Sequence, residues 1–414
     1  MGDAVPTSQL TGLARLLASF KLPGFRLFVA SNLFSAVDMN VRIAIHGWLV
    51  LVLSDDSEFW VGIFALVLGL GQVTFSMVAG AIVDRFQRRN ILLIEGFISA
   101  SVAGSIATLV YLEVATLWMV IAISFPMGCQ RALRFIAANR MVYDLVGPRQ
   151  LVNGVSLWRL SASPMMIFGA LLAGALIDWT GLWAAYGFMA LSLGTSLIFL
   201  ALVRAHGDVA QSGLSLLSQT VEGMGLVRHS PPLRTLFTTS IVMESFGFAF
   251  LIMIPVMAKN VLEVTGVGLG FLQAGVGVGM LGASLVMAMR GDAEHKSRVV
   301  FASALVAGVA LIGFSLSRSL PLSVVLAAAT MGFLNAYDLT LGALLQLVSP
   351  PAYRGRAVSL HSLAISFTAL GGFMMGVVGG VVGVPLVLGV SGSAIVVNSL
   401  VRRRGLLNIK ERSE

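Results

Sequence analysis

The chain is dominated by long apolar stretches that are separated by short polar segments. Of its 414 residues, 57% are hydrophobic and 11% are charged, whereas soluble domains carry about 25% charged residues. A helix needs about 20 apolar residues to cross the hydrocarbon core of a bilayer. Stretches of about this length predict membrane spans near residues 25–53, 59–83, 91–112, 116–138, 155–177, 183–203, 235–259, 267–289, 299–317, 321–346, 358–380 and 384–401.

Lipid offers the backbone no hydrogen-bond partners, so these spans are expected to be α-helices. The predicted fold is therefore an all-α polytopic membrane protein with about twelve transmembrane helices. Residues 1–23 contain no long apolar core, and we expect no cleaved signal peptide there.

Basic residues are unevenly divided between the two sides of this topology. If the N-terminus is cytoplasmic, only Lys259 and Arg318 fall in loops of the far side, and four arginines (Arg42, Arg131, Arg134 and Arg159) lie within spans. The positive-inside rule then places both termini in the cytoplasm, in a plasma membrane or bacterial inner membrane. The same rule accounts for the net charge of +8, so we expect no nucleic-acid partner.

Short repeats recur at an offset close to half the chain length. GVSLWRL at 154–160 resembles AVSLHSL at 357–363, and WVGIF at 60–64 aligns with GVGLG at 266–270. Internal repeats of this kind are typical of secondary transporters. We predict a six-helix bundle over 1–203, a cytoplasmic linker over 204–232 and a second six-helix bundle over 233–414, the two bundles being pseudo-symmetric.

The loop after the second span carries the sharpest motif, GAIVDRFQRR at 80–89. It resembles the signature of the major facilitator superfamily, with Gln87 standing where that family usually has glycine. The matching residues are Gly80, Asp84, Arg85, Arg88 and Arg89. With the span count and the repeat, the resemblance covers essentially the whole chain. It is closest to the drug:proton antiporter branch that includes siderophore and macrolide exporters.

We interpret this motif as a cytoplasmic gate. Asp84 can lie near the positive N-terminal end of a helix in the other bundle, and the arginines can pair with acids or carbonyl groups. The alternative is that the arginines only obey the positive-inside rule, which does not explain Asp84. The corresponding position in the second half, near Arg290, has no acid.

Charged residues within the spans are costly in hydrocarbon and therefore indicate function. In the first span, Ser35, Asp38, Arg42 and His46 follow helical spacing, which predicts one face that lines a central cavity. Asp38 and Arg42 are four residues apart and can pair. The alternative is a buried structural ion pair.

Further polar candidates lie in the fourth, seventh and tenth spans. The resemblance implies that Arg131 or Arg134 takes part in proton coupling, although Arg134 could instead reach the membrane interface. The repeat aligns Arg134 with Asp338, so we expect these opposite charges to face each other across the cavity. Glu244 and Asn335 complete the predicted proton and substrate site, while a helix-packing role for Asp338 is the alternative.

These features favour a proton-coupled exporter of small amphipathic or lipophilic molecules that works by alternating access. A lysophospholipid or nutrient transporter of the same fold is an alternative, and a non-transporting membrane sensor or assembly partner is another. The chain has neither the phosphate-binding glycine-rich loop nor a hydrolase motif, so we predict that it is not an enzyme. We expect no cofactor and no metal, a monomer surrounded by membrane lipid, and protons as the coupling ion.

Overall fold

The computed structural model describes residues 18–147, 150–204, 230–290, 295–349, 361, 363–407 and 409. Within these residues the chain forms helices and no strands, and eleven helices are long and apolar enough to cross a membrane. These findings confirm the predicted fold class. The remaining predicted span, the first, is divided into shorter helices by a π-helical turn.

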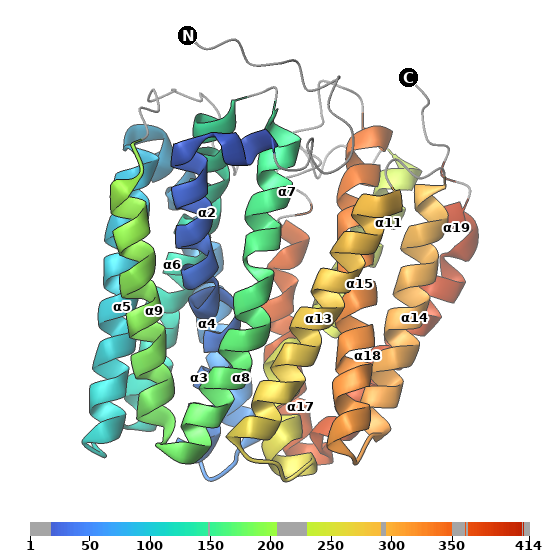
Figure 1. The fold of residues 1–414 in the computed structure, drawn as a ribbon. Helices are drawn as coiled ribbons and strands as arrows, with labels where there is room; N and C mark the ends of the chain where they lie inside the picture. The colour runs from blue at the N-terminus through green and yellow to red at the C-terminus, as the bar shows by residue number, and fades with distance from the viewer. Residues whose placement is uncertain are drawn as a thin grey trace.

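Helices from residues 18–204 form one group, and helices from residues 230–409 form another beside it (Figure 1). The first group consists of η2 (Ala18–Lys21), α2 (Pro23–Ala36), η3 (Val37–Val41), α3 (Arg42–Leu53), α4 (Glu58–Arg85), α5 (Arg88–Tyr111), α6 (Leu117–Val146), α7 (Leu151–Ser161), α8 (Ser163–Trp179) and α9 (Leu182–Leu202). The second group consists of α11 (Pro231–Val242), η5 (Met243–Phe248), α12 (Phe250–Val256), η6 (Met257–Val261), α13 (Gly266–Arg290), α14 (Lys296–Leu316), α15 (Leu320–Val348), α17 (Phe367–Val382), α18 (Val384–Val401) and α19 (Arg403–Leu407).

The two groups meet where α4 packs on α17, α8 on α13, and α3 on α12. Residues 205–229 of the predicted linker lie outside the described residues. On the basis of this arrangement, we propose that the chain is divided into the two predicted helix bundles.

Local sequence explains where several helices begin and end. Pro23 and Pro231 are the first residues of α2 and α11, where the missing N–H has no partner to lose. Gly181 and Gly383 have φ angles of 106° and 87°, which favour glycine, and they form the tight connections from α8 to α9 and from α17 to α18.

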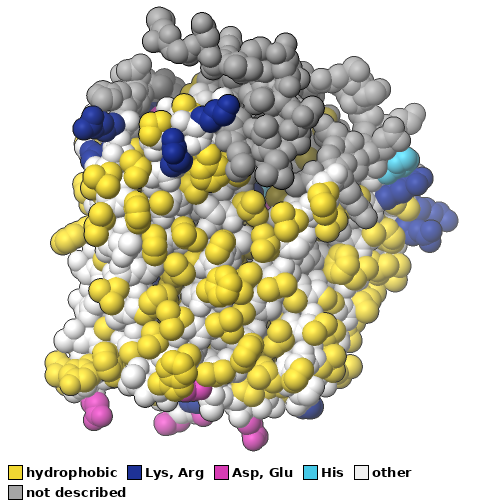
Figure 2. Space-filling view, viewed as in Figure 1, with side chains coloured by type: hydrophobic (Ala, Val, Ile, Leu, Met, Phe, Trp, Pro, Cys, Tyr) yellow, Lys and Arg dark blue, Asp and Glu magenta, His cyan; other side chains and the backbone are white. Residues whose placement is uncertain are grey.

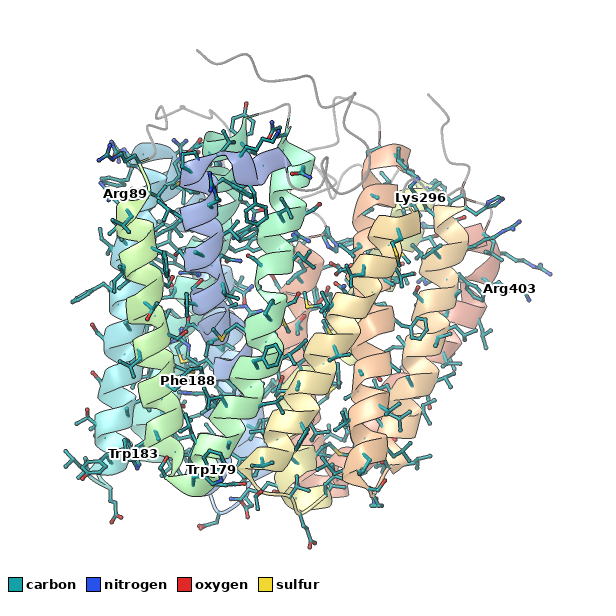
Figure 3. The ribbon with its side chains drawn as sticks, in the orientation of Figure 1. Arg89, Trp179, Trp183, Phe188, Lys296 and Arg403 are labelled. Carbon is teal, nitrogen blue, oxygen red and sulfur yellow. The ribbon has the colours of Figure 1, made fainter. Side chains whose placement is uncertain are left out.

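Charge is distributed asymmetrically along the helix axes. Lys and Arg side chains gather at the end where α2 begins and α9 ends, and Asp and Glu side chains gather at the opposite end (Figure 2). Arg89, Lys296 and Arg403 lie toward the first end, which we call the terminal side, whereas Trp179 and Trp183 lie at the opposite side (Figure 3). Tryptophan is enriched where membrane helices enter the interface.

Candidate functional site

A cluster of buried charges occupies the middle of the first bundle. Asp38 pairs with Arg42 at 2.8 Å, and Glu95 of α5 pairs with Arg134 of α6 at 2.8 Å. These side chains and Arg131 line one cavity. Since charges are costly in hydrocarbon unless they are paired, the cluster depends on helices that are distant in sequence, namely α2–α3, α5 and α6.

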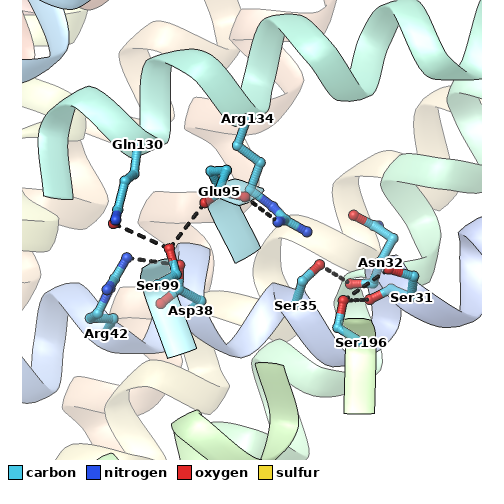
Figure 4. Close-up of polar contacts among 10 residues, drawn as sticks. All are labelled: Ser31, Asn32, Ser35, Asp38, Arg42, Glu95, Ser99, Gln130, Arg134 and Ser196. Carbon is cyan, nitrogen blue, oxygen red and sulfur yellow. Dashed lines mark hydrogen bonds and ion pairs between the residues drawn. The ribbon is translucent and has the colours of Figure 1, made fainter. Parts of the chain in front are cut away.

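Glu95 is a buried acid of the cluster that the sequence analysis does not name among its candidate residues. It is 2% exposed, and its carboxylate lies 3.0 Å from the Ser99 hydroxyl, which in turn lies 3.1 Å from Gln130 Oε1 (Figure 4). The signal was present in the sequence, because Glu95 is an acid inside a predicted span. Its partner could not be read from the sequence, since Arg134 is 39 residues away.

The cavity inside this cluster is small. Its volume is about 20 Å³, which is enough for about one water molecule. Asp38 Oδ1, Arg42 Nη1 and Gln130 Nε2 are buried and make no hydrogen bond in the part of the chain that the structure describes. The site is therefore suited to a proton or a water molecule and not to a drug-sized substrate.

His46 is not among the residues that line the cavity beside Asp38 and Arg42. It is fully buried, with Nδ1 2.9 Å from the Tyr186 hydroxyl and Nε2 3.1 Å from the Val120 carbonyl oxygen. Residues 37–41 are π-helical, and this turn changes the register between Asp38 and α3, whereas His46 stays one helical turn from Arg42 within α3. His46 therefore joins α3 to α6 and α9 within the first bundle.

A second group of ionisable residues lies in the second bundle. Glu244 is 5% exposed and accepts a hydrogen bond of 2.5 Å from Thr368 of α17. Asp338 of α15 lies 3.0 Å from His361 Nε2, and Tyr337 has a buried hydroxyl group that makes no hydrogen bond among the described residues. The second bundle thus holds two carboxyl groups with neutral or titratable partners in place of arginine.

The two groups occupy equivalent positions in the two halves. Asp38 and Glu244 are 206 residues apart, the same offset that relates 60–64 to 266–270. Each lies on a π-helical turn, Asp38 in η3 and Glu244 in η5. Turns of this kind are rare in proteins overall, and those that occur are often found at functional sites. The repeat therefore places one buried acid on a widened turn in each half.

Arg134, Asp338 and Asn335 each contact residues of their own half of the chain. Arg134 and Asp338 do not pair, because Arg134 contacts Glu95 and Asp338 contacts His361. Asn335 donates hydrogen bonds of 2.9 Å to the Met280 carbonyl and to the Ser284 hydroxyl, both on α13. The Asn335 side chain therefore joins α15 to α13.

The motif residues lie at the terminal side of α4 and α5. Asp84 pairs with Arg140 of α6 at 2.5 Å, Arg88 lies 3.7 Å from Asp144, and Arg89 donates to the Ala201 carbonyl at the end of α9. These contacts are all within the first bundle. Arg85 is exposed and Gly80 is partly buried one turn before Asp84. The segment 350–360, which precedes the eleventh span, lies outside the described residues.

Polar contacts join the two bundles at the opposite side. Asp178, at the end of α8, accepts hydrogen bonds from Thr265 Oγ1 at 2.5 Å, Gly266 N at 2.7 Å and Val267 N at 3.0 Å. It therefore caps the N-terminus of α13. Lys259 also pairs with Asp56, and Asn260 donates to the Asp56 carbonyl at 2.8 Å.

Two helix bundles with buried charges in their interiors define a membrane transporter of the major facilitator fold. The family model described as "Transmembrane secretion effector" matches residues 14–413. The chain therefore belongs to this family of the major facilitator superfamily.

Relatives and solved structures agree with this assignment. An uncharacterised transporter of the major facilitator type from Sinorhizobium fredii is 28% identical over 85% of this chain and 84% of its own length. Macrolide efflux protein A from Streptococcus pyogenes is 27% identical over 73% of this chain and 76% of its own. The fold matches a nucleoside transporter structure with a TM-score of 0.70 and 14% identity, covering 92% and 99% of the two chains. A bacterial homologue of the iron transporter ferroportin matches with a TM-score of 0.68 and 16% identity, covering 96% and 100%.

Proposed function

We propose that this transporter exports small amphipathic or lipophilic molecules in exchange for protons. The observation that carries the proposal is the pair of buried acids, Asp38 and Glu244, on π-helical turns at equivalent positions of the two halves. A buried carboxyl group is costly when charged and unpaired. Such a group is therefore stable as a paired anion or as a protonated acid, and it can alternate between the two as its partners move.

The first bundle supplies the coupling step of this proposal. Asp38 pairs with Arg42, and Glu95 pairs with Arg134. When a rearrangement separates a pair, the carboxylate loses its counter-charge and binds a proton. Re-forming the pair expels that proton. Because the cavity holds about one water molecule, the substrate would bind elsewhere.

The second bundle supplies the carboxyl groups for a cationic or polar part of the substrate. Asp338 is 28% exposed at its side chain and is therefore more accessible than Glu95, at 2%. The relatives named macrolide efflux protein A suggest macrolides as the first substrates to test.

We assign the terminal side to the cytoplasm, because basic residues gather there and acidic residues gather at the other side, as the positive-inside rule requires. The capping of α13 by Asp178 then closes the extracellular side. In the opposite state, Asp84 and its partners would close the cytoplasmic side.

Transport of a fluorescent macrolide by purified protein in proteoliposomes tests the proposal. In vesicles where the cytoplasmic side of the protein faces outward, we expect a pH gradient to drive uptake of the macrolide. An ionophore that abolishes the gradient should stop this uptake. Flux that is indifferent to the gradient would leave a facilitator, and no flux with any amphipathic substrate would contradict export.

A further inference from the structure

An apolar groove lies between α13, α14 and α15, outside the ionisable clusters. Its volume is about 560 Å³. The helix α15 packs against both α13 and α14, and these three helices stand side by side in Figure 1. Except for Arg298 and Ser303, every lining residue is apolar or glycine.

Small residues create this space. All three helices contribute short side chains or glycine, among them Gly282 and Ala283 of α13, Ala302 of α14, and Ala329 and Gly332 of α15. A side chain added at Gly282 would meet no atom within 4 Å. The groove is therefore open at this point.

The groove lies on the lipid-facing side of α15. The groove is lined on α15 by Ala328, Ala329, Gly332, Phe333 and Ala336. At 3.6 residues per turn, the centre of this set lies roughly 150° around the helix axis from Asp338. The lining residues Val278, Val286 and Val306 are 52%, 40% and 38% exposed. An exposed apolar surface at this depth contacts hydrocarbon.

One charged residue marks the terminal-side end of the groove. Arg298 lies in the first turn of α14 and is exposed. Val306, at the other end of the α14 lining, is eight residues further on, which is about 12 Å along the helix. That length is close to half of a hydrocarbon core of about 30 Å. Along α14 the groove thus runs from the membrane interface to about the middle of the bilayer.

We propose that this groove binds one phospholipid of the terminal-side leaflet, with an acyl chain along α15 and the phosphate at Arg298. Charge complementarity and the length of one leaflet select this occupant. An arginine presents a planar set of donors that matches phosphate oxygens. A bound lipid would fill the gap between α13 and α14 and brace both helices against α15.

Native mass spectrometry of the purified protein, titrated with phosphatidylglycerol, tests this proposal. We expect the wild-type protein to retain one lipid. Arg298→Gln should bind it about fivefold more weakly, because one basic residue near the membrane surface contributes about 1 kcal/mol to the binding of anionic lipid. Gly282→Leu fills the groove and should have an effect of at least the same size. Ala329→Leu is a second filling variant should Gly282→Leu not fold.

Matched controls change the same residue types elsewhere. Arg234→Gln removes an exposed arginine from α11 on the same side, and Gly194→Leu adds the same bulk to α9 at a position with no atom within 4 Å. Both should bind the lipid as the wild type does. The proposal is overturned if all variants bind alike, if only one of the charge and filling variants weakens binding, or if glycerol 3-phosphate competes as well as the lipid.

Discussion

At the scale of single residues, the buried charges of the first bundle are mutually dependent. Asp38 and Arg42 are 6% and 4% exposed, and each keeps one buried atom without a hydrogen bond among the described residues. Gln130 keeps an unsatisfied amide nitrogen beside Ser99. Unsatisfied buried polar atoms are uncommon in proteins. Their concentration around one water-sized cavity fits a site whose protons and partners change during the transport cycle.

Glu95→Gln should abolish transport driven by a pH gradient. The amide keeps the shape of the carboxylate, but it leaves Arg134 buried without its counter-charge, which costs about 3–5 kcal/mol in stability. The measurement is proton-driven flux in proteoliposomes together with the thermal unfolding midpoint.

The double variant Glu95→Gln, Arg134→Gln separates coupling from stability. It removes both charges, so the midpoint should recover while driven transport stays absent. Recovery of transport would show that the pair is only structural. Glu113→Gln, which changes an exposed acid on the opposite side, is the control.

Asp84→Asn should greatly reduce transport while the protein still inserts and folds. The change removes the charge that pairs with Arg140. This pair is partly exposed, so its contribution to stability is about 0–1 kcal/mol, and a large loss of flux must come from the gate. Asp55→Asn is the matched control, since Asp55 is an exposed acid outside the motif. Wild-type flux in Asp84→Asn would rule out the gate role.

At the scale of helices, close packing depends on glycine where two backbones touch. A Cβ atom at Gly128 of α6 would lie 2.0 Å from the Leu68 carbonyl oxygen of α4. Close approach of this kind is common between membrane helices. Here it brings α6 and its arginines near α4, so the position of the charge cluster depends on this contact.

Gly128→Ala should therefore destabilise the first bundle by about 1–3 kcal/mol, because overpacking forces the backbone to shift. The thermal unfolding midpoint in detergent measures this effect. Gly194→Ala, which adds the same methyl group where no atom lies within 4 Å, should leave the midpoint unchanged. Equal midpoints for the two variants would contradict the role of the α4–α6 contact.

At the scale of the whole molecule, Asp178 joins the two bundles through the N-terminus of α13. A carboxylate at this position is stabilised by the free N–H groups and by the helix dipole. The contact exists only while the bundles meet at the side opposite the termini, so it contributes to the balance between the two transport states.

Asp178→Ala should lower the ratio of closed to open molecules on that side about fivefold, since loss of a cap costs about 1 kcal/mol. Spin labels on cysteines at Val114 and Ser319, which are exposed on different bundles, would report the change as longer distances in a Cys129→Ser background. Asp55→Asn is the control. An unchanged distance distribution would mean that apolar packing alone sets this balance.

The fold class, the approximate number of membrane spans and the motif at 80–89 could all be predicted from the sequence. These follow from the thickness of the bilayer, from backbone hydrogen bonding in lipid, and from the distribution of basic residues. The repeat also relates Asp38 to Glu244, which are 206 residues apart.

Only the tertiary structure decided which charges meet. Glu95 and Arg134 are brought together by the packing of α5 on α6, His46 bonds to α6 and α9, and Asn335 bonds to α13. Helical periodicity assigns a residue to a face, but it cannot detect an extra residue in a turn or identify the helix that the face will meet. Those contacts depend on packing between segments that are distant in the sequence.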